Sequence, residues 1–523
     1  MEALTIKEIA QGVGGTILTG DENMQITNVS TNSKRLEAGS LFVPIIGEKV
    51  DAHDFIPDAF ENGATACFTS RHKELTKDMN QSMVYISVKD TLEALQALGT
   101  YYRSKFKIPV IGITGSVGKT TTKEMIAAAL ETRYKVLKTE GNMNSQVGLP
   151  LMMLRLDSSY DIAVIEMGMS EFGEMARLSK IARPEAAVVT NIGVSHIGQL
   201  KTRENIRKEK LNIINSFRSD SILFVNGNDD LLSEVYTASH TLQARKNGAG
   251  DGFEEMNKEY SQNPVIIDLS PETLEKFYQS KVIGFGTEGI CDYWAENIRT
   301  SQGKTYFTLR KTRKHNKESK DGDAESTAEN RPEGDGEEII LQVLGIHNVY
   351  NALVALAVSE HYHIPVSVAK EGLYNYQPIA MRGQIKDVNQ IRIIDDSYNA
   401  SPDSMKSGIQ VLLEMENITR RIAVLADILE LGELSYQCHY DVGTYIAEQK
   451  VDEVVTVGKE AAYIAKGVQD KNSGIVTHSF SSNQEAIQYL NGQLKPGDGM
   501  LVKGSRSMRT DEIVKAIIEE KSK

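Results

Sequence analysis

One short stretch constrains the fold of this chain more than any other. Residues 110–123 read Val-Ile-Gly-Ile-Thr-Gly-Ser-Val-Gly-Lys-Thr-Thr-Thr-Lys, which is an apolar strand, a glycine-flanked turn and the polar start of a helix. Glycines allow backbone N–H groups to turn toward an anion, and the start of a helix adds the positive end of its dipole. The stretch therefore predicts an α/β domain that holds the phosphates of ATP or GTP.

The turn is a variant of the common phosphate-binding loop. Position 113 is Ile and a glycine stands at position 112 instead, so the motif reads Thr-Gly-x-x-Gly-Lys-Thr. A glycine-rich turn without a nucleotide is the alternative, but the Lys-Thr pair between strand and helix argues against it. We expect the phosphates to lie against Gly115, Ser116, Val117, Gly118, Lys119, Thr120 and Thr121.

Composition and charge argue against several other classes of protein. The chain has 523 residues, a length that suggests about three or four domains. The net charge of −13 argues against a nucleic-acid surface. The cysteines at positions 67, 291 and 438 have no metal-like spacing and predict neither disulfides nor a zinc site. We find no export signal and no run of about 18 apolar residues, so we expect a cytoplasmic protein without a membrane span.

Apolar segments divide the chain into three expected domains, at residues 1–107, 108–379 and 380–523. The first carries short strands near residues 40–45 and 64–68 and a helix from residue 91 to about residue 106. In the other two, short apolar strands alternate with helical stretches, which predicts parallel sheets covered by helices. The strands are expected at residues 108–114, 162–166, 186–191 and 222–226, and then at residues 392–395, 422–426, 453–457 and 500–503.

Two polar stretches interrupt this alternation. Residues 244–263 are rich in Gly, Asn, Glu and Lys and are expected to form a surface excursion. Residues 310–338 begin with basic residues and continue with acidic ones, and such a composition cannot bury enough apolar surface to fold. Because strand-like segments at 304–309 and 339–344 flank it, we expect the disordered tip of a β-hairpin. A partner-binding arm is the alternative.

Two residues at strand ends are candidate metal ligands beside Thr120. Glu166 closes an apolar strand, and His196 follows another in the sequence Thr-Asn-Ile-Gly-Val-Ser-His. Ligand sites of open α/β sheets lie at the carboxyl ends of the strands, where a metal ion can meet the phosphates. A solvated glutamate and a polar loop histidine are the alternatives.

The order of these motifs resembles that of the Mur ligases, the ATP-dependent enzymes that form the amide bonds of the peptidoglycan stem peptide. The resemblance runs over nearly the whole chain and includes Gly-Asn-Met-Asn-Ser at residues 141–145 and Leu-Gly-Ile-His-Asn-Val-Tyr-Asn-Ala-Leu at residues 344–353. It implies a three-domain α/β architecture with a UDP-sugar-binding N-terminal domain, a central P-loop ATPase domain with a parallel sheet and a Rossmann-like C-terminal domain. It also implies a cytoplasmic monomer that uses ATP and Mg²⁺.

Three C-terminal motifs, at residues 395–405, 425–433 and 502–509, resemble in particular the family member that joins D-alanyl-D-alanine to UDP-N-acetylmuramoyl tripeptide through an acyl phosphate. The sister enzyme that adds the third residue usually carries Asp-Asn-Pro-Arg, a sequence that this chain does not contain. Another ATP-dependent ligase, such as that sister enzyme or a folylpolyglutamate synthase, is one alternative. A P-loop switch or motor that docks a partner through residues 310–338 is another.

The resemblance assigns expected roles to individual residues. Lys119 and Thr120 would contact the phosphates and Mg²⁺, Glu166 and His196 would serve the metals, and Arg382 would reach the γ-phosphate when the third domain closes. Without the resemblance, the remaining candidates read as helix-start and turn residues. These are His347, Asn348 and Asn351 near adenine, Asp396 facing ATP, and Tyr398 and Asn399 near the incoming dipeptide.

A lysine of this family is carbamoylated by CO₂, which turns a cation into an anionic oxygen ligand for the metal. The segment here reads Arg-Lys-Glu-Lys-Leu-Asn, and alignment selects Lys210 as the carbamoylated residue. Lys208 is the alternative, and Asn212 stands where this ligase often has Glu. From sequence alone, either lysine reads as part of a solvated helix face.

The expected UDP-sugar segment lies in the first domain, at residues 30–35 and 42–55. Its common Asp-Ser-Arg appears here as Asn-Ser-Lys at residues 32–34. We expect Ser33 to contact the substrate, with Lys34 as a point charge for a pyrophosphate. The role of His53 stays open.

Overall fold

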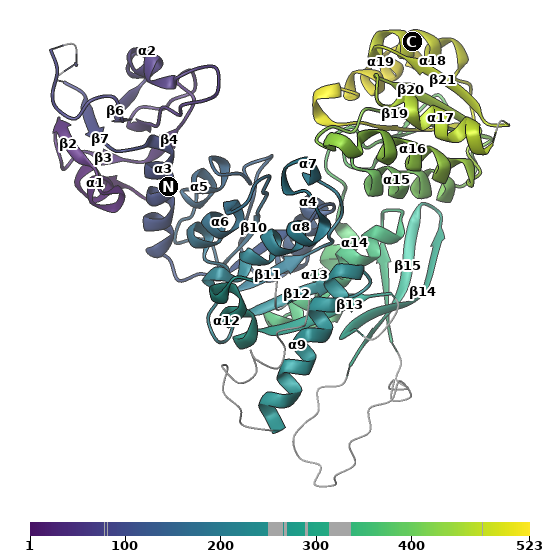
Figure 1. Ribbon diagram of the computed structural model, residues 1–523, viewed down its shortest axis with the longest axis horizontal. Helices are drawn as coiled ribbons and strands as arrows, with labels where there is room; N and C mark the ends of the chain where they lie inside the picture. The colour runs from purple at the N-terminus through teal and green to yellow at the C-terminus, as the bar shows by residue number, and fades with distance from the viewer. Residues whose placement is uncertain are drawn as a thin grey trace.

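A computed structural model of the chain describes residues 1–77, 79–80, 82–248, 265, 269–287, 291–312, 336–472 and 474–522. These residues form three lobes, each built around its own sheet. The N-terminal lobe, in purple, and the C-terminal lobe, in green to yellow, lie at opposite ends of the molecule with the central lobe between them (Figure 1).

The central sheet has the strand order β16-β15-β14-β13-β12-β11-β8-β10-β9. Neighbouring strands from β9 to β14 are parallel, and β15 and β16 extend the sheet as antiparallel strands. The strands are β8 (Val110–Thr114), β9 (Val136–Lys138), β10 (Ile162–Glu166), β11 (Ala186–Val189), β12 (Ile222–Asn226), β13 (Lys281–Gly286), β14 (Tyr293–Ser301), β15 (Lys304–Lys311) and β16 (Glu337–Leu341).

Both faces of this sheet are buried, so its central strands are continuously apolar. Ile111 and Ile113 of β8 pack into one core cluster with helices α4 (Lys119–Leu130) and α13 (Ile346–His361). Val110, which points to the other face, belongs to a second cluster with α5 (Gly148–Met153) and α6 (Glu174–Ala182). The alternation along β8 therefore places the loop after Thr114 between two helical layers.

The N-terminal lobe is joined to the central lobe by a continuous core. Its sheet has the order β2-β7-β6-β5-β4, formed by β2 (Thr16–Thr19), β4 (Asn28–Ser30), β5 (Ser40–Phe42), β6 (Ala64–Thr69) and β7 (Val84–Ser87). Helix α3 (Thr91–Ser104) packs against α5 and α6. Tyr102 donates its hydroxyl to the Leu156 carbonyl at 2.6 Å, and Arg103 Nε donates to the Ala182 carbonyl at 3.0 Å. These bonds satisfy buried polar groups within the shared cluster.

The C-terminal lobe is built around another, separate sheet with the order β17-β18-β22-β19-β20-β21. All neighbours are parallel except the edge strand β17, which is antiparallel to β18. The strands are β17 (Gln384–Val388), β18 (Ile391–Asp395), β19 (Arg420–Ala426), β20 (Glu453–Val457), β21 (Val476–Phe480) and β22 (Asp498–Lys503). Helices α15 (Pro402–Glu414) and α16 (Ser435–Ala447) lie on the side that faces the central lobe in Figure 1.

The predicted α/β class and the alternation of strands and helices are confirmed. The predicted hairpin strands also pair antiparallel, with Thr305 opposite Leu341. The expected disordered tip was placed too wide, because residues 310–311 and 337–338 belong to the paired strands β15 and β16, and the interval 313–335 lies outside the described residues. Residues 244–248 of the expected surface excursion are the end of helix α9 (Asp230–Gly248), and 249–263 lie outside the described part. Within the described residues, no helix is long and apolar enough to span a membrane.

Candidate active site

The turn after β8 requires glycine for two different reasons. Gly115 has φ +146°, and a Cβ added there would lie 1.9 Å from the hydroxyl oxygen of Thr190. Gly118 caps α4 with φ +86°, in the left-handed region that side chains disfavour. The turn therefore passes so close to the loop after β11 that a side chain at position 115 does not fit.

Thr190 and Asn191, two polar residues of the loop after β11, hold this turn through its backbone. Ser116 N–H donates to the Asn191 carbonyl at 3.0 Å, and Val117 N–H donates to Asn191 Oδ1 at 2.9 Å. The Val117 carbonyl accepts from Asn191 Nδ2 at 3.0 Å and from Thr190 Oγ1 at 2.6 Å. Because these groups are already paired, the amides that can face a phosphate are those at residues 118–121, where a helix start has no intrahelical acceptor.

The Lys119 side chain folds back over the phosphate-binding turn. Its Nζ donates to the Gly115 carbonyl at 2.8 Å. Burial lowers the pKa of Lys119, Arg382 lowers it further, and Glu166 acts in the opposite direction. Lys119 and Arg382 therefore come from different lobes but lie close enough for their charges to interact, so the region has a positive potential that favours an anion.

Thr120 and Glu166 meet below the turn, as the sequence predicted for a metal site. Thr120 Oγ1 donates to Glu166 Oε2 at 2.8 Å, and Asn144 Nδ2 donates to Glu166 Oε1 at 2.7 Å. Both Thr120 and Glu166 are buried. The described residues contain no group of three or more His, Cys, Asp or Glu side chains that could hold a metal. A hydroxyl and one carboxylate nevertheless fit Mg²⁺, which takes few protein ligands and completes its shell with phosphates and water.

His196 lies beside a residue of the C-terminal lobe. It caps α7 (Ile197–Leu200) with φ 64°, and its Nδ1 is 2.8 Å from Glu430 Oε2, close enough for an ion pair although the two groups are not aligned as a hydrogen bond. Contact with His196 lowers the pKa of Glu430. Glu430 was not predicted from the sequence, although it belongs to the C-terminal motif at residues 425–433. The pairing of His196 with Glu430 could not be read from the sequence, because 234 residues separate the two partners.

The candidate adenine residues lie at the start of α13. Thr122 Oγ1 donates to Asn351 Oδ1 at 2.9 Å, which ties α13 to α4. Asn348 Nδ2 donates to the Leu344 carbonyl at 2.7 Å, and burial lowers the pKa of His347. The two asparagines thus position the helix as well as facing the cavity, and their role toward adenine stays a prediction.

The candidate residues of the C-terminal lobe are joined by a buried lysine that the sequence analysis did not select. Lys503 Nζ lies 2.5 Å from Asp396 Oδ2 and donates to the Asn399 carbonyl at 3.0 Å. The Arg382 guanidinium stands 3.9 Å above the Tyr398 ring. The position of Lys503 at the end of an apolar strand, inside a motif already recognised, was the available signal.

These groups line one cavity of about 930 Å³ between the central and C-terminal lobes. Ser33, Gly115 and Lys210 are not among its lining residues. Ser33 lies in the N-terminal lobe, where its carbonyl accepts from Asn62 Nδ2 at 3.0 Å. The candidates that line the cavity are Ser116, Val117, Gly118, Lys119, Thr120, Thr121, Glu166, His196, His347, Asn348, Asn351, Arg382, Asp396, Tyr398 and Asn399.

Lys210 is buried on helix α8 (Arg203–Leu211), whereas Lys208 on the same helix is exposed. Burial lowers the pKa of Lys210 well below its usual value, and the charge of Lys119 lowers it further. An amine becomes a nucleophile toward CO₂ only in its neutral form. Of the two lysines left open by the sequence, Lys210 therefore has the environment that carbamoylation needs.

His53, whose role the sequence left open, is a buried structural residue. Its Nδ1 lies 2.6 Å from Asp51 Oδ1, and its Nε2 accepts from the Ser70 N–H at 3.1 Å. Both ring nitrogens are thus engaged within the N-terminal lobe.

Comparison with known proteins gives matches along the whole chain. Three family models match: "Mur ligase family, catalytic domain" at residues 25–103, "Mur ligase middle domain" at residues 113–264, and "Mur ligase, glutamate ligase domain" at residues 381–506. The UDP-N-acetylmuramoyl-tripeptide--D-alanyl-D-alanine ligase of Bacillus subtilis is 36% identical over 518 residues, which cover 98% of each chain. The Escherichia coli enzyme of the same name is 31% identical over 526 residues, 99% of each chain.

Solved structures agree with these sequence matches. A crystal structure of MurF from Acinetobacter baumannii has a TM-score of 0.80 and 26% identity and covers 99% of each chain. The MurF ligase of Thermotoga maritima in complex with ADP has a TM-score of 0.72 and 25% identity and covers 94% of this chain and 97% of that one. With relatives more than 30% identical over nearly their full length, this chain belongs to the Mur ligase family, as its motifs predicted.

Proposed function

We propose that this protein joins D-alanyl-D-alanine to UDP-N-acetylmuramoyl tripeptide at the expense of ATP, forming the UDP-N-acetylmuramoyl pentapeptide of peptidoglycan synthesis. The observation that carries the proposal is the cavity in which the phosphate-binding turn of the central lobe faces the Asp396 motif of the C-terminal lobe. Relatives with the name of this ligase match the chain over both lobes.

The proposed chemistry solves the problem that a carboxylate is a poor electrophile. A carboxylate oxygen of the tripeptide attacks the γ-phosphorus of ATP, ADP leaves, and an acyl phosphate forms. The amine of D-alanyl-D-alanine then attacks the acyl carbon, loses a proton and expels inorganic phosphate. Lys119 and Arg382 would screen the approach of one anion to another, so that positioning and charge neutralisation supply most of the catalysis.

Mg²⁺ would be held by Thr120 and Glu166, with His196 and a carbamate on Lys210 serving a second metal. When bound, the metal neutralises phosphate charge and orients the reacting oxygens. The hydrogen-bonded pair of Thr120 and Glu166 and the lowered pKa of Lys210 support these roles. His347, Asn348, Asn351 and Asp396 would bind ATP, Tyr398 and Asn399 the dipeptide, and Ser33 the UDP-sugar.

The proposed setting is the cytoplasm, where ATP is available, and the proposed working form is a monomer. The cavity lies between lobes of one chain, so the candidate ATP site needs no second copy to complete it.

The proposal is tested by phosphate release from ATP and Mg²⁺, with the tripeptide and D-alanyl-D-alanine supplied singly and together. We expect release only with both substrates, together with the mass of the pentapeptide product. Release without them would favour a nucleotide switch. No release with both would contradict the proposal and would direct the search to other amino acids or to folates.

A further inference from the structure

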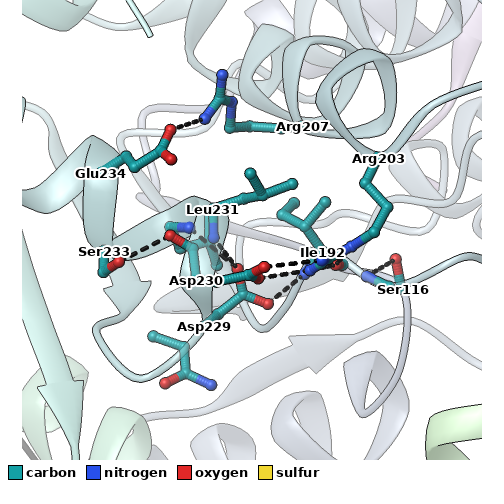
Figure 2. Close-up of polar contacts among 12 residues, drawn as sticks. Ser116, Ile192, Arg203, Arg207, Asp229, Asp230, Leu231, Ser233 and Glu234 are labelled. Carbon is teal, nitrogen blue, oxygen red and sulfur yellow. Dashed lines mark hydrogen bonds and ion pairs between the residues drawn. The ribbon is translucent and has the colours of Figure 1, made fainter. Parts of the chain in front are cut away.

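The first residue of α8, Arg203, and the residue just before α9, Asp229, both bind the backbone of Ile192 in the loop after β11. We call residues 190–196 the β11 loop. The Ile192 N–H donates to Asp229 Oδ2 at 2.8 Å, and the Ile192 carbonyl accepts from Arg203 Nε at 3.0 Å and from a terminal nitrogen of Arg203 at 2.7 Å. Figure 2 shows Arg203 of α8 and Asp229, the residue before α9, converging on Ile192. Both backbone polar groups of this buried residue are thereby held by charged side chains.

The side chains of Asp229 and Arg203 are themselves held in place by further hydrogen bonds. Asp229 Oδ1 accepts from the backbone N–H groups of Leu231 and Leu232 at 3.1 and 3.0 Å, which caps the start of α9. Arg203 also pairs with Asp230 at 2.8 and 2.5 Å. The Arg203–Asp230 pair is partly exposed, so by itself it contributes little to stability. Its main effect is to keep the guanidinium pointed at the Ile192 carbonyl.

Hydrogen bonds on either side of Ile192 connect the β11 loop to the phosphate-binding turn. One residue after Ile192, the Gly193 N–H donates to Ser116 Oγ at 2.9 Å. One residue before it, the Asn191 side chain accepts from the Val117 N–H and donates to the Val117 carbonyl. The loop ends at His196. A shift of Ile192 would therefore move both the phosphate-binding turn and the candidate metal ligand His196.

We propose that Arg203, supported by Asp229, is a positioning residue of the ATP site. It holds the β11 loop so that the loop keeps the phosphate-binding turn in the shape that binds nucleotide. This inference deepens the proposed function and rests on the same cavity, but its first consequence is nucleotide affinity, which needs neither peptide substrate.

The competing explanation is that Arg203 merely fastens α8 to α9. The chain offers a matched control, because Arg207 and Glu234 form a second pair between the same helices, four residues further along each, at 2.5 Å. In Figure 2 this pair stands apart from the contacts around Ile192. If Arg203 only fastens the two helices, loss of either pair should change ADP affinity similarly. If Arg203 positions the β11 loop, only its own substitution should weaken ADP binding.

The experiment measures the dissociation constant of ADP with Mg²⁺ by calorimetry on the full chain, together with the melting temperature. Arg203→Lys keeps the charge but loses the fork that binds the carbonyl and Asp230 at once. We expect it to weaken ADP binding about 10- to 100-fold, the range for a lost charge-assisted hydrogen bond. Glu234→Gln should leave ADP affinity unchanged even where it lowers the melting temperature. Equal losses in both variants, or no loss in Arg203→Lys, would overturn the proposal.

A double-mutant cycle checks the route and does not depend on stability. Ser116→Ala removes the acceptor through which Gly193 reaches the turn. If Arg203 acts through the β11 loop, the losses in ADP affinity from Arg203→Lys and Ser116→Ala will be less than additive. Fully additive losses would show that Arg203 acts by another route. An active ligase with normal ADP affinity in Arg203→Lys would refute the inference while leaving the proposed function intact.

Discussion

At the scale of single residues, burial changes the chemistry of Lys210. An ammonium loses hydration when it is buried, so the neutral amine is favoured and the pKa falls. The structure adds the charge of Lys119, which acts in the same direction. Lys208 lies on the same helix but is exposed to solvent. The distinction between two neighbouring lysines is therefore made by their environment.

The lowered pKa of Lys210 predicts a pH-dependent cost to stability. Between its folded value and its ordinary value near 10.5, the unfolded chain binds a proton that the folded chain does not, so stability rises with pH across that window. Lys210→Met should therefore raise the melting temperature at pH 7 in CO₂-free buffer, and the gain should shrink toward pH 10. Thermal unfolding at several pH values checks this. Lys208→Met is the control and should change little, and a lower melting temperature for Lys210→Met at pH 7 would contradict the argument.

Arg382 yields a second prediction for a single residue. Its guanidinium stacks on Tyr398 and acts electrostatically on Lys119, so it is held near the phosphate site. Arg382→Ala should lower kcat by about 10³-fold or more, as for other arginines that stabilise phosphoryl transfer. Tyr398→Leu, which removes the stacking surface but keeps the charge, should cost much less. Steady-state kinetics distinguish the two, and a loss confined to KM for the dipeptide would contradict the role at the phosphate.

At the scale of elements, the phosphate turn depends on the loop beside it. The turn has no rigid secondary structure of its own, and Thr190 and Asn191 of β11's loop hold its backbone. The turn follows strand β8 in the chain, whereas the loop after the neighbouring strand β11 holds the turn in its conformation. This explains why a motif with an unusual glycine spacing can still form a phosphate site.

The close approach at Gly115 makes this dependence testable. Gly115→Ala would place a methyl group 1.9 Å from Thr190 Oγ1, so the turn and the β11 loop must separate. We expect ADP affinity to fall at least about tenfold, because the amides of residues 118–121 would no longer converge. Gly303 also has positive φ, but a Cβ added there would meet nothing within 4 Å. Gly303→Ala is therefore the control, because it introduces only backbone strain. Equal losses of ADP affinity in both variants would mean that strain alone, and not the contact with Thr190, is responsible.

At the scale of the whole molecule, the three lobes are joined in different ways. The N-terminal and central lobes share one hydrophobic cluster that runs through α3. The C-terminal lobe has its own core, against which the central lobe places, among the described residues, only Leu344 and Val194, and polar contacts such as His196 with Glu430 and the Gly345 N–H with Glu414 at 2.9 Å add to this junction. We therefore expect the C-terminal lobe to be the part that moves when ATP and the substrates bind.

Glu430 tests how the C-terminal lobe is held. Glu430→Ala removes its ion-pair contact with His196, and we expect a larger radius of gyration in small-angle scattering of the nucleotide-free protein. Glu433→Ala, an exposed residue of the same turn, should leave the scattering unchanged. A bound ATP analogue with the tripeptide should restore a compact form in Glu430→Ala. A covalent lock of the closed form that leaves turnover intact would show that lobe movement is not required.

Several buried parallel strands were predicted from the sequence nearly to the residue, although the buried strand β13 (Lys281–Gly286) was not predicted. Ile162–Glu166 and Glu453–Val457 have the predicted bounds because strands buried on both faces are continuous apolar runs. The edge strand Gln384–Val388 was missed, since half-exposed residues there break the apolar run. At the site, Thr120 and Glu166 meet as predicted, but Glu430 and Lys503 were not foreseen as partners of His196 and Asp396.

The sequence by itself determined the local elements, the phosphate-binding turn and the membership of the Mur ligase family, because each depends on residues that are close along the chain or in a recognisable order. Only the tertiary structure decided which charges meet. The pairing of His196 with Glu430, the burial of Lys210 but not Lys208, and the clamp on Ile192 all depend on how separate elements pack together. Packing brings residues distant in the chain within hydrogen-bonding distance and removes them from water, and the local sequence carries no signal of either effect.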